Sequence, residues 1–131
     1  MAASTTPIYP LTPKSVPVAV GTANTGRDGT GTIATIYDPG TDGGRLDRIR
    51  LQATVTTTDG VFRLWQRASA AGTWFLIEEI LMTAITPSTT VQAWSYDWVP
   101  PIPLVLEDGT LIGGSVHNAE NVNATPYAGN F

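Results

Sequence analysis

The pattern of apolar and polar residues is clearest between residues 45 and 56, where every second residue from Ile49 to Val55 is apolar. The apolar positions are Ile49, Leu51, Ala53 and Val55. An alternation with a period of two is typical of a half-buried β-strand, because successive side chains of a strand point to opposite faces. The segments 61–67 and 91–98 alternate in the same way. The pattern therefore predicts strands in all three places.

Glycine and proline interrupt the rest of the chain too often for long helices. Further strand candidates between these breaks are 16–20, 32–37, 74–83, 104–106, 111–117 and 122–127. The apolar run around Glu78 and Glu79 also fits a short helix, and we interpret it as a strand because its neighbours are strands. Eight or nine short strands predict an all-β protein, a β-sandwich or a barrel, and among these we favour a jelly roll.

Asp-Gly pairs punctuate the chain at four places, which are residues 28–29, 42–43, 59–60 and 108–109. Both residues of this dipeptide tolerate a positive φ angle, so the pair suits tight turns. Four such turns predict a topology rich in hairpins.

Proline spacing sets the first fifteen residues apart, with Pro7, Pro10 and Pro13 three residues from one another. Proline fixes φ and removes a backbone donor, which excludes a helix or an inner strand. We expect residues 1–15 to form an extended arm, either a loose terminus or a strap across a neighbouring subunit. Residues 16–131 are then a single β-sandwich domain.

The composition excludes several classes of function. A chain of 131 residues has the length of one domain, and no run of eighteen apolar residues predicts a membrane-spanning helix. The first twelve residues lack the apolar core of an export signal. A net charge of -4 argues against binding to nucleic acid, and the lack of cysteine excludes disulfides and thiolate zinc sites. Charged residues make up only 14%, as in a subunit whose surface meets other subunits.

Candidate catalytic residues are few. His117 is the only histidine, and a hydrolase site would need it beside Ser115 or Ser95 and an aspartate. We interpret Ser115 and His117 as a polar strand end. Glu78 and Glu79 point to opposite faces of a strand, so they cannot form the carboxylate pair of a glycosidase.

Two loops resemble ligand-binding motifs without meeting their requirements. Residues 29–34 match a dinucleotide-binding pattern, but they open a predicted strand instead of a helix. Residues 38–44 hold two aspartates but lack the spaced acidic positions of a calcium loop, so we expect a plain turn. We predict no catalytic residue, no metal site and no cofactor, and hence no enzyme.

Interaction residues are the stronger prediction. Trp94, Tyr96 and Trp98 fall on one strand face, which fits core packing, a sugar-binding platform or a subunit interface. Arg48 and Arg50 project together from a strand whose other face is apolar, which favours salt bridges at the surface or between subunits over phosphate binding. The candidate interface residues are Pro7, Pro10, Pro13, Arg48, Arg50, Trp94, Tyr96 and Trp98.

Several stretches resemble a known group of proteins. Residues 22–37 and 43–50, the His-Asn-Ala-Glu at 117–120 and the closing Gly-Asn-Phe at 129–131 are similar to small structural proteins encoded among the head genes of tailed bacteriophages. The likeness covers about residues 16 to 131.

This resemblance implies a capsid decoration, or cement, protein. Such proteins are β-sandwich or jelly-roll subunits that gather as trimers on the capsid exterior and clamp neighbouring capsomers. The expected partners are the major capsid protein and further copies of the chain, with no nucleic acid and no membrane. The expected location is the virion, after synthesis in the bacterial cytoplasm. The family has no catalytic motif to carry over, and the alternatives are a phage tail, neck or fibre component and a carbohydrate-binding module.

Overall fold

The computed structural model describes residues 10–69 and 71–131, and these residues form strands and connections without a helix. The ten strands are β1 (Thr12–Lys14), β2 (Val18–Val20), β3 (Ala34–Tyr37), β4 (Gly44–Ala53), β5 (Gly60–Arg67), β6 (Phe75–Met82), β7 (Ser95–Trp98), β8 (Leu104–Leu106), β9 (Leu111–Val116) and β10 (Val122–Asn130). Each of the nine predicted segments overlaps one strand, and the region around Glu78 and Glu79 is a strand, as predicted. Only β1 lies outside the predicted set.

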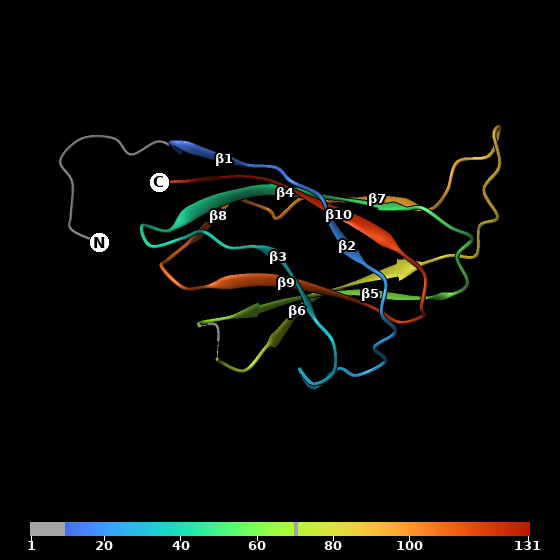
Figure 1. The fold of residues 1–131 in the computed structure, drawn as a ribbon, viewed down its shortest axis with the longest axis horizontal. Helices are drawn as coiled ribbons and strands as arrows, with labels where there is room; N and C mark the ends of the chain where they lie inside the picture. Colours follow the sequence, from blue (N-terminus) through green and yellow to red (C-terminus); the bar gives the residue numbers. More distant parts are fainter. Residues whose placement is uncertain (1–9, 70) are drawn as a thin grey trace.

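The strands form two antiparallel sheets that lie face to face (Figure 1). The first, called here the β4 sheet, has the order β1-β10-β4-β7, with β2 also paired to β10 and β8 also paired to β4. The second, the β5 sheet, has the order β3-β9-β5-β6. The two facing antiparallel sheets confirm the prediction of an all-β sandwich for the described residues.

The prediction of many hairpins is wrong. Among the described strands, β5 and β6 are the one consecutive pair joined by hydrogen bonds, and most other connections cross from one sheet to the other. The turn chemistry agrees, because Gly29, Gly43 and Gly109 have positive φ angles while no described residue other than glycine does. A two-residue hairpin turn of the expected type needs a positive φ at both central residues.

The core lies between the two sheets and is built largely on β4. Leu46, Ile49 and Leu51 are fully buried, opposite the equally buried Phe62 and Leu64 of β5. The alternation of polar and apolar residues in β4 thus separates a core face from a solvent face, as predicted. The strand ends at Ala53, earlier than the pattern suggested.

A second apolar cluster lies on the outer face of the β5 sheet, where Trp65, Trp74 and Leu111 are buried. The connection of residues 21–33 covers this face, and Asn24 organises it by donating its side-chain amide to the Thr30 and Thr32 carbonyls at 3.0 Å. Ile33 at the end of this connection packs against the cluster. The β5 sheet is therefore apolar on both faces in its middle.

The described part of the predicted arm belongs to the sandwich. Pro7 lies outside the described residues, whereas Pro13 sits in β1 opposite Gly129 of β10. The Leu11 backbone N–H donates to the Asn130 carbonyl at 2.7 Å. β1 is an edge strand, which is where proline is tolerated within a sheet.

Candidate interaction surfaces

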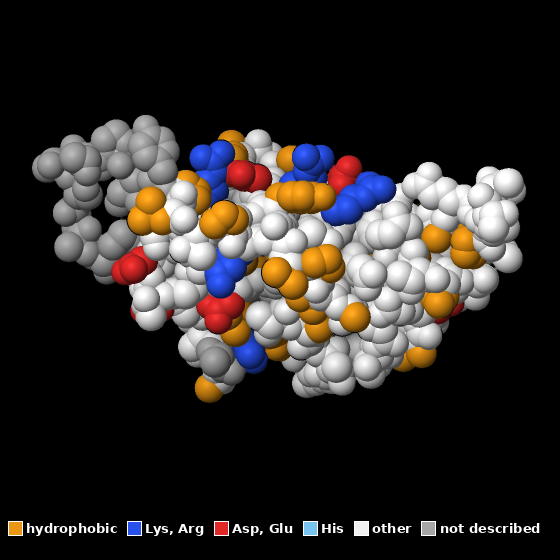
Figure 2. Space-filling model, turned by 45° about the horizontal axis from the view of Figure 1, so that its top comes forward, with side chains coloured by type: hydrophobic (Ala, Val, Ile, Leu, Met, Phe, Trp, Pro, Cys, Tyr) orange, Lys and Arg blue, Asp and Glu red, His pale blue; other side chains and the backbone are white. Residues whose placement is uncertain are grey.

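Arginine and aspartate side chains alternate on the outer face of the β4 sheet. Figure 2 shows blue and red side chains next to one another along the upper side of the molecule. Arg50 and Arg48 both reach Asp97 of β7, at 3.2 and 3.8 Å. Arg48 also lies over the Tyr127 ring, 5.2 Å from its centroid. The predicted surface salt bridges of Arg48 and Arg50 are thus present.

Arg48 and Arg50 share a face because they are two residues apart in β4, and a bulge brings Asp47 to the same side. A register shift opposite Tyr127 and Ala128 makes a bulge that turns both Asp47 and Arg48 outward. These ion pairs are partly exposed, so each contributes little to folding stability, about 1 kcal/mol or less. The face is therefore available for contacts with a charged partner.

The predicted aromatic face is only partly at the surface. Trp94 is a core residue with 5% of its surface exposed, so its assignment as an interface residue is wrong. The Trp94 carbonyl accepts the Ala53 N–H at 2.8 Å, so Trp94 continues the pairing of β7 with β4 and lies on the same strand face as Tyr96 and Trp98. Trp98 is half-buried, and Tyr96 is the exposed member of the three.

The other two tryptophans are also enclosed. The Trp65 indole N–H donates to the Ser115 hydroxyl at 2.9 Å, and Trp74 lies beneath the Arg67 guanidinium at 4.2 Å. With Trp94 in the core and Trp98 half-buried, the described residues present no open tryptophan platform for a sugar.

Ser115 and His117 do not converge on a catalytic arrangement. The Ser115 hydroxyl is fully buried and already accepts the Trp65 N–H, while His117 follows the end of β9. Within residues 10–69 and 71–131, no three side chains of His, Asp or Glu gather as metal ligands would. The same residues hold no helix that is long and apolar enough to cross a membrane.

A cluster of three charged side chains, of which only Arg63 is buried, links the cover to the β5 sheet. Glu79 of β6 accepts from Arg27 of the covering connection at 2.8 Å and from Arg63 of β5 at 3.0 Å. Hydrogen bonding from Arg27 lowers the pKa of the Glu79 carboxyl below its usual range. Only 6% of the Arg63 side chain is exposed, so this arginine is enclosed between the sheet and the connection. The sequence pattern drew attention to Glu79 only as half of a rejected carboxylate pair and did not single out Arg27 or Arg63.

Large apolar side chains are exposed along one side of the sandwich. β6 is the last strand of the β5 sheet, and β7 and β8 both flank β4 at the rim of the other sheet. Seven side chains on these strands and the link between β7 and β8 are 38 to 77% exposed. They define the β6–β8 edge, which consists of Phe75, Ile77, Leu81, Tyr96, Val99, Ile102 and Val105. Only Tyr96 was among the predicted interface residues.

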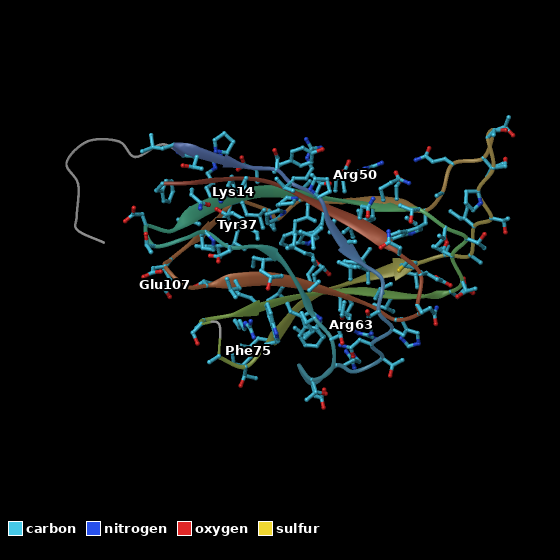
Figure 3. The ribbon with its side chains drawn as sticks, in the orientation of Figure 1. Lys14, Tyr37, Arg50, Arg63, Phe75 and Glu107 are labelled. Atoms are coloured by element: carbon cyan, nitrogen blue, oxygen red, sulfur yellow. The ribbon has the colours of Figure 1, made fainter. Side chains whose placement is uncertain are left out.

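Two adjoining hollows of about 230 and 400 Å³ open at one end of this edge. Both are lined by Gln66, Glu107 and Thr110, and the smaller one is completed by Phe75, Ile77, Arg67 and Ala68. Figure 3 shows Phe75 and Glu107 at the same end of the molecule. The walls are largely apolar, with one cation and one anion.

Comparisons with known proteins give no assignment, because no family model matches the chain and no curated protein is similar to it. The surfaces themselves therefore carry the functional argument.

Proposed function

We propose that the protein is a non-enzymatic virion protein that decorates the outside of a bacteriophage head and stabilises the contacts between capsomers. It is made in the bacterial cytoplasm, binds the major capsid protein and acts as a homo-oligomer, which we expect to be a trimer. It needs no cofactor and has neither nucleic acid nor membrane as a partner.

The strand order is the observation that carries this proposal. One sheet runs β2-β10-β4 and ends in β7 and β8, and the other runs β3-β9-β5-β6. β7 and β8 pair with successive parts of β4 and count as one strand position. This order of eight positions, with repeated crossing between the sheets, supports a jelly roll built from two Greek keys. Jelly rolls serve as viral capsid domains and as lectin domains. The resemblance of residues 22–37 and 43–50 to phage head proteins favours the first of these uses.

The surfaces suit a protein that adds buried area across joints in a shell. The outer face of the β4 sheet offers Arg48 and Arg50 to acidic groups of a capsid protein. β1 carries Pro13 along one rim of this sheet, and Pro10 precedes it, so that an arm formed by the preceding residues would leave from this end. Several such contacts on one oligomer would give strong attachment even where each contact is modest.

Binding to undecorated phage heads tests the proposal. Purified protein is mixed with heads that lack it, and the bound fraction is measured after sedimentation of the heads. We expect saturable binding and heads that resist heat to a higher temperature. Deletion of residues 1–9 should weaken binding while the melting temperature of the free protein stays the same. Heads that take up no protein at any concentration would contradict the proposal.

The alternatives give different results in simple assays. A tail, neck or fibre component would be found at that part of the particle by labelled electron microscopy. A carbohydrate-binding module has some support, because jelly rolls include lectins and Tyr96 and Phe75 are exposed aromatic rings. Binding on a glycan array, with loss in Tyr96→Ala, would favour this second function.

A further inference from the structure

The β6–β8 edge holds seven of the twelve large hydrophobic side chains that are exposed in the described part of the chain. The opposite side, where β1 and β2 lie near β3, exposes two, Leu11 and Val16. Edge strands with exposed apolar side chains are prone to associate unless something covers them. The asymmetry between the two sides indicates that one side of the sandwich meets a partner.

In the middle of the edge, the Glu78 carboxylate links the two sheets and occupies a backbone N–H of β6. Glu78 of β6 accepts the Trp98 indole N–H from the other sheet at 3.2 Å. Its second oxygen accepts the backbone N–H of Glu79, also at 3.2 Å. That N–H is therefore not free to pair with an added strand, so a partner would contact this edge mainly through side chains.

Two unpaired charges of opposite sign lie at the hollow beside Phe75 and Ile77. Among the described residues, neither Arg67 nor Glu107 forms an ion pair, and the buried Arg67 Nε has no hydrogen-bond partner. A surface that carries both signs can be complementary to a second copy of itself. This matters for a chain of net charge -4, because its copies repel one another over most of their surface.

The exposed area of the β6–β8 edge residues is of the same order as one side of a standard interface, and slightly smaller. Seven large side chains at these exposures present on the order of 700 Å², against the about 800 Å² that each partner buries in an interface of standard size. Phe75 beside its hollow resembles the aromatic anchors that dominate binding energy in protein interfaces.

We propose that the β6–β8 edge is the surface through which the protein associates with a second copy of itself, with Arg67 of one copy facing Glu107 of the next. The inference deepens the proposed function, on which its biological role rests, because a self-associated subunit supplies several capsid contacts at once. Its physical test does not require a capsid.

Solution mass measured by light scattering over a range of concentrations is the first experiment. We expect the unaltered protein to form a defined oligomer, and the double variant Phe75→Ser, Ile102→Ser to have the monomer mass of 13.9 kDa. Val91→Ser is the matched control, since Val91 is an exposed apolar residue in the connection between β6 and β7, and it should keep the oligomer mass. Thermal melting verifies that the variants remain folded. An unaltered protein that is monomeric throughout, or a double variant that keeps the oligomer mass, would overturn the proposal.

A charge reversal provides a second test that does not depend on the apolar residues. Arg67→Glu and Glu107→Arg should each weaken self-association by about tenfold or more, and the variant with both changes should regain most of it. If the variant with both charge reversals associates no more tightly than either single reversal does, the Arg67–Glu107 contact is contradicted. Measured separately on undecorated heads, a monomeric variant that binds as tightly as the unaltered protein argues against a role for self-association. A stable oligomer that never binds heads instead contradicts the capsid function alone.

Discussion

The two outer faces of the sandwich carry similar sequences and have opposite environments. β4 places Arg48 and Arg50 on its outer face, and β5 places Arg63, Trp65 and Arg67 on its own. On β4 the arginines remain partly exposed, with Tyr127 and Asp97 as neighbours. On β5 the connection of residues 21–33 covers the face, and Arg63 and Trp65 are buried. An alternating pattern with arginine therefore does not by itself identify a solvent face.

The difference arises from β9, the neighbour of β5. Gly113 leaves room on the outer face, since a Cβ there would lie 2.7 Å from the Trp74 ring and 2.8 Å from Ile33. Gly114 does the same on the core face, where a Cβ would lie 2.7 Å from Ile36. Two consecutive glycines thus allow apolar groups to pack closely on both sides of one strand. The β4 sheet has no equivalent pair in the middle of β10.

Removal of one aromatic ring from each face should give the largest contrast. In both places an arginine lies over the ring, Arg67 over Trp74 and Arg48 over Tyr127. We expect Trp74→Ala to lower the free energy of unfolding by about 3 kcal/mol or more, because it empties a buried site. Tyr127→Ala, at a half-exposed site, should cost about 1 kcal/mol or less. Urea unfolding measures both free energies. Equal losses in the two variants would show that the connection of residues 21–33 does not make the Trp74 site more stabilising than the Tyr127 site.

Filling the space above β9 should have a smaller effect. We expect Gly113→Ala to destabilise the fold by about 1–3 kcal/mol, since the added methyl group forces Trp74 and Ile33 apart. Gly72→Ala is the control, because a Cβ there meets nothing closer than 3.2 Å. Near-UV circular dichroism of the tryptophans should change in Gly113→Ala alone. If the spectrum and the free energy of unfolding of Gly113→Ala are both unchanged, the connection of residues 21–33 accommodates the methyl group without loss of stability.

Acid should weaken the covered face through Glu79. The lowered pKa of this carboxyl means that its bonds to Arg27 and Arg63 stabilise the fold above the ordinary pKa of 4.5. That contribution is lost as the pH falls from 4.5 through the folded-state pKa. We therefore expect the unaltered protein to lose stability over this range more steeply than Glu79→Gln. Parallel stability curves for the two proteins would contradict a role for the ionised carboxylate.

Local patterns in the sequence predicted the strands, because alternation and turn residues act over a few positions. The position of β4, the outward Arg48 and Arg50 and the strand at Glu78 and Glu79 all follow from such short-range signals. The order of strands in the sheets depends on contacts between distant segments, and the expectation of hairpins was wrong for that reason.

The candidate surfaces were predicted less well than the strands. Trp94 shares one strand face with Tyr96 and Trp98, as the alternation predicted, but that face is the core side of β7, and Trp94 is buried there. The β6–β8 edge was missed because Phe75 and Ile77 belong to an apolar run that reads as buried strand. The signal for exposure was the run itself, since consecutive apolar residues on an edge strand cannot all face the core. Only the sheet order identifies β6 as an edge.

The smallest effect is expected on the open face of β4. Replacement of Arg48 and Arg50 by alanine removes both contacts to Asp97, yet these groups are partly exposed and screened by salt. The double variant should lose no more than about 1 kcal/mol of unfolding free energy. Binding to undecorated heads should fall much more than stability does. Binding of the unaltered protein should weaken as salt is raised, because salt screens the arginines, and binding of the double variant should depend less on salt. A variant that loses stability but binds heads normally would place the role of these arginines inside the fold, as for Arg63 on the covered face.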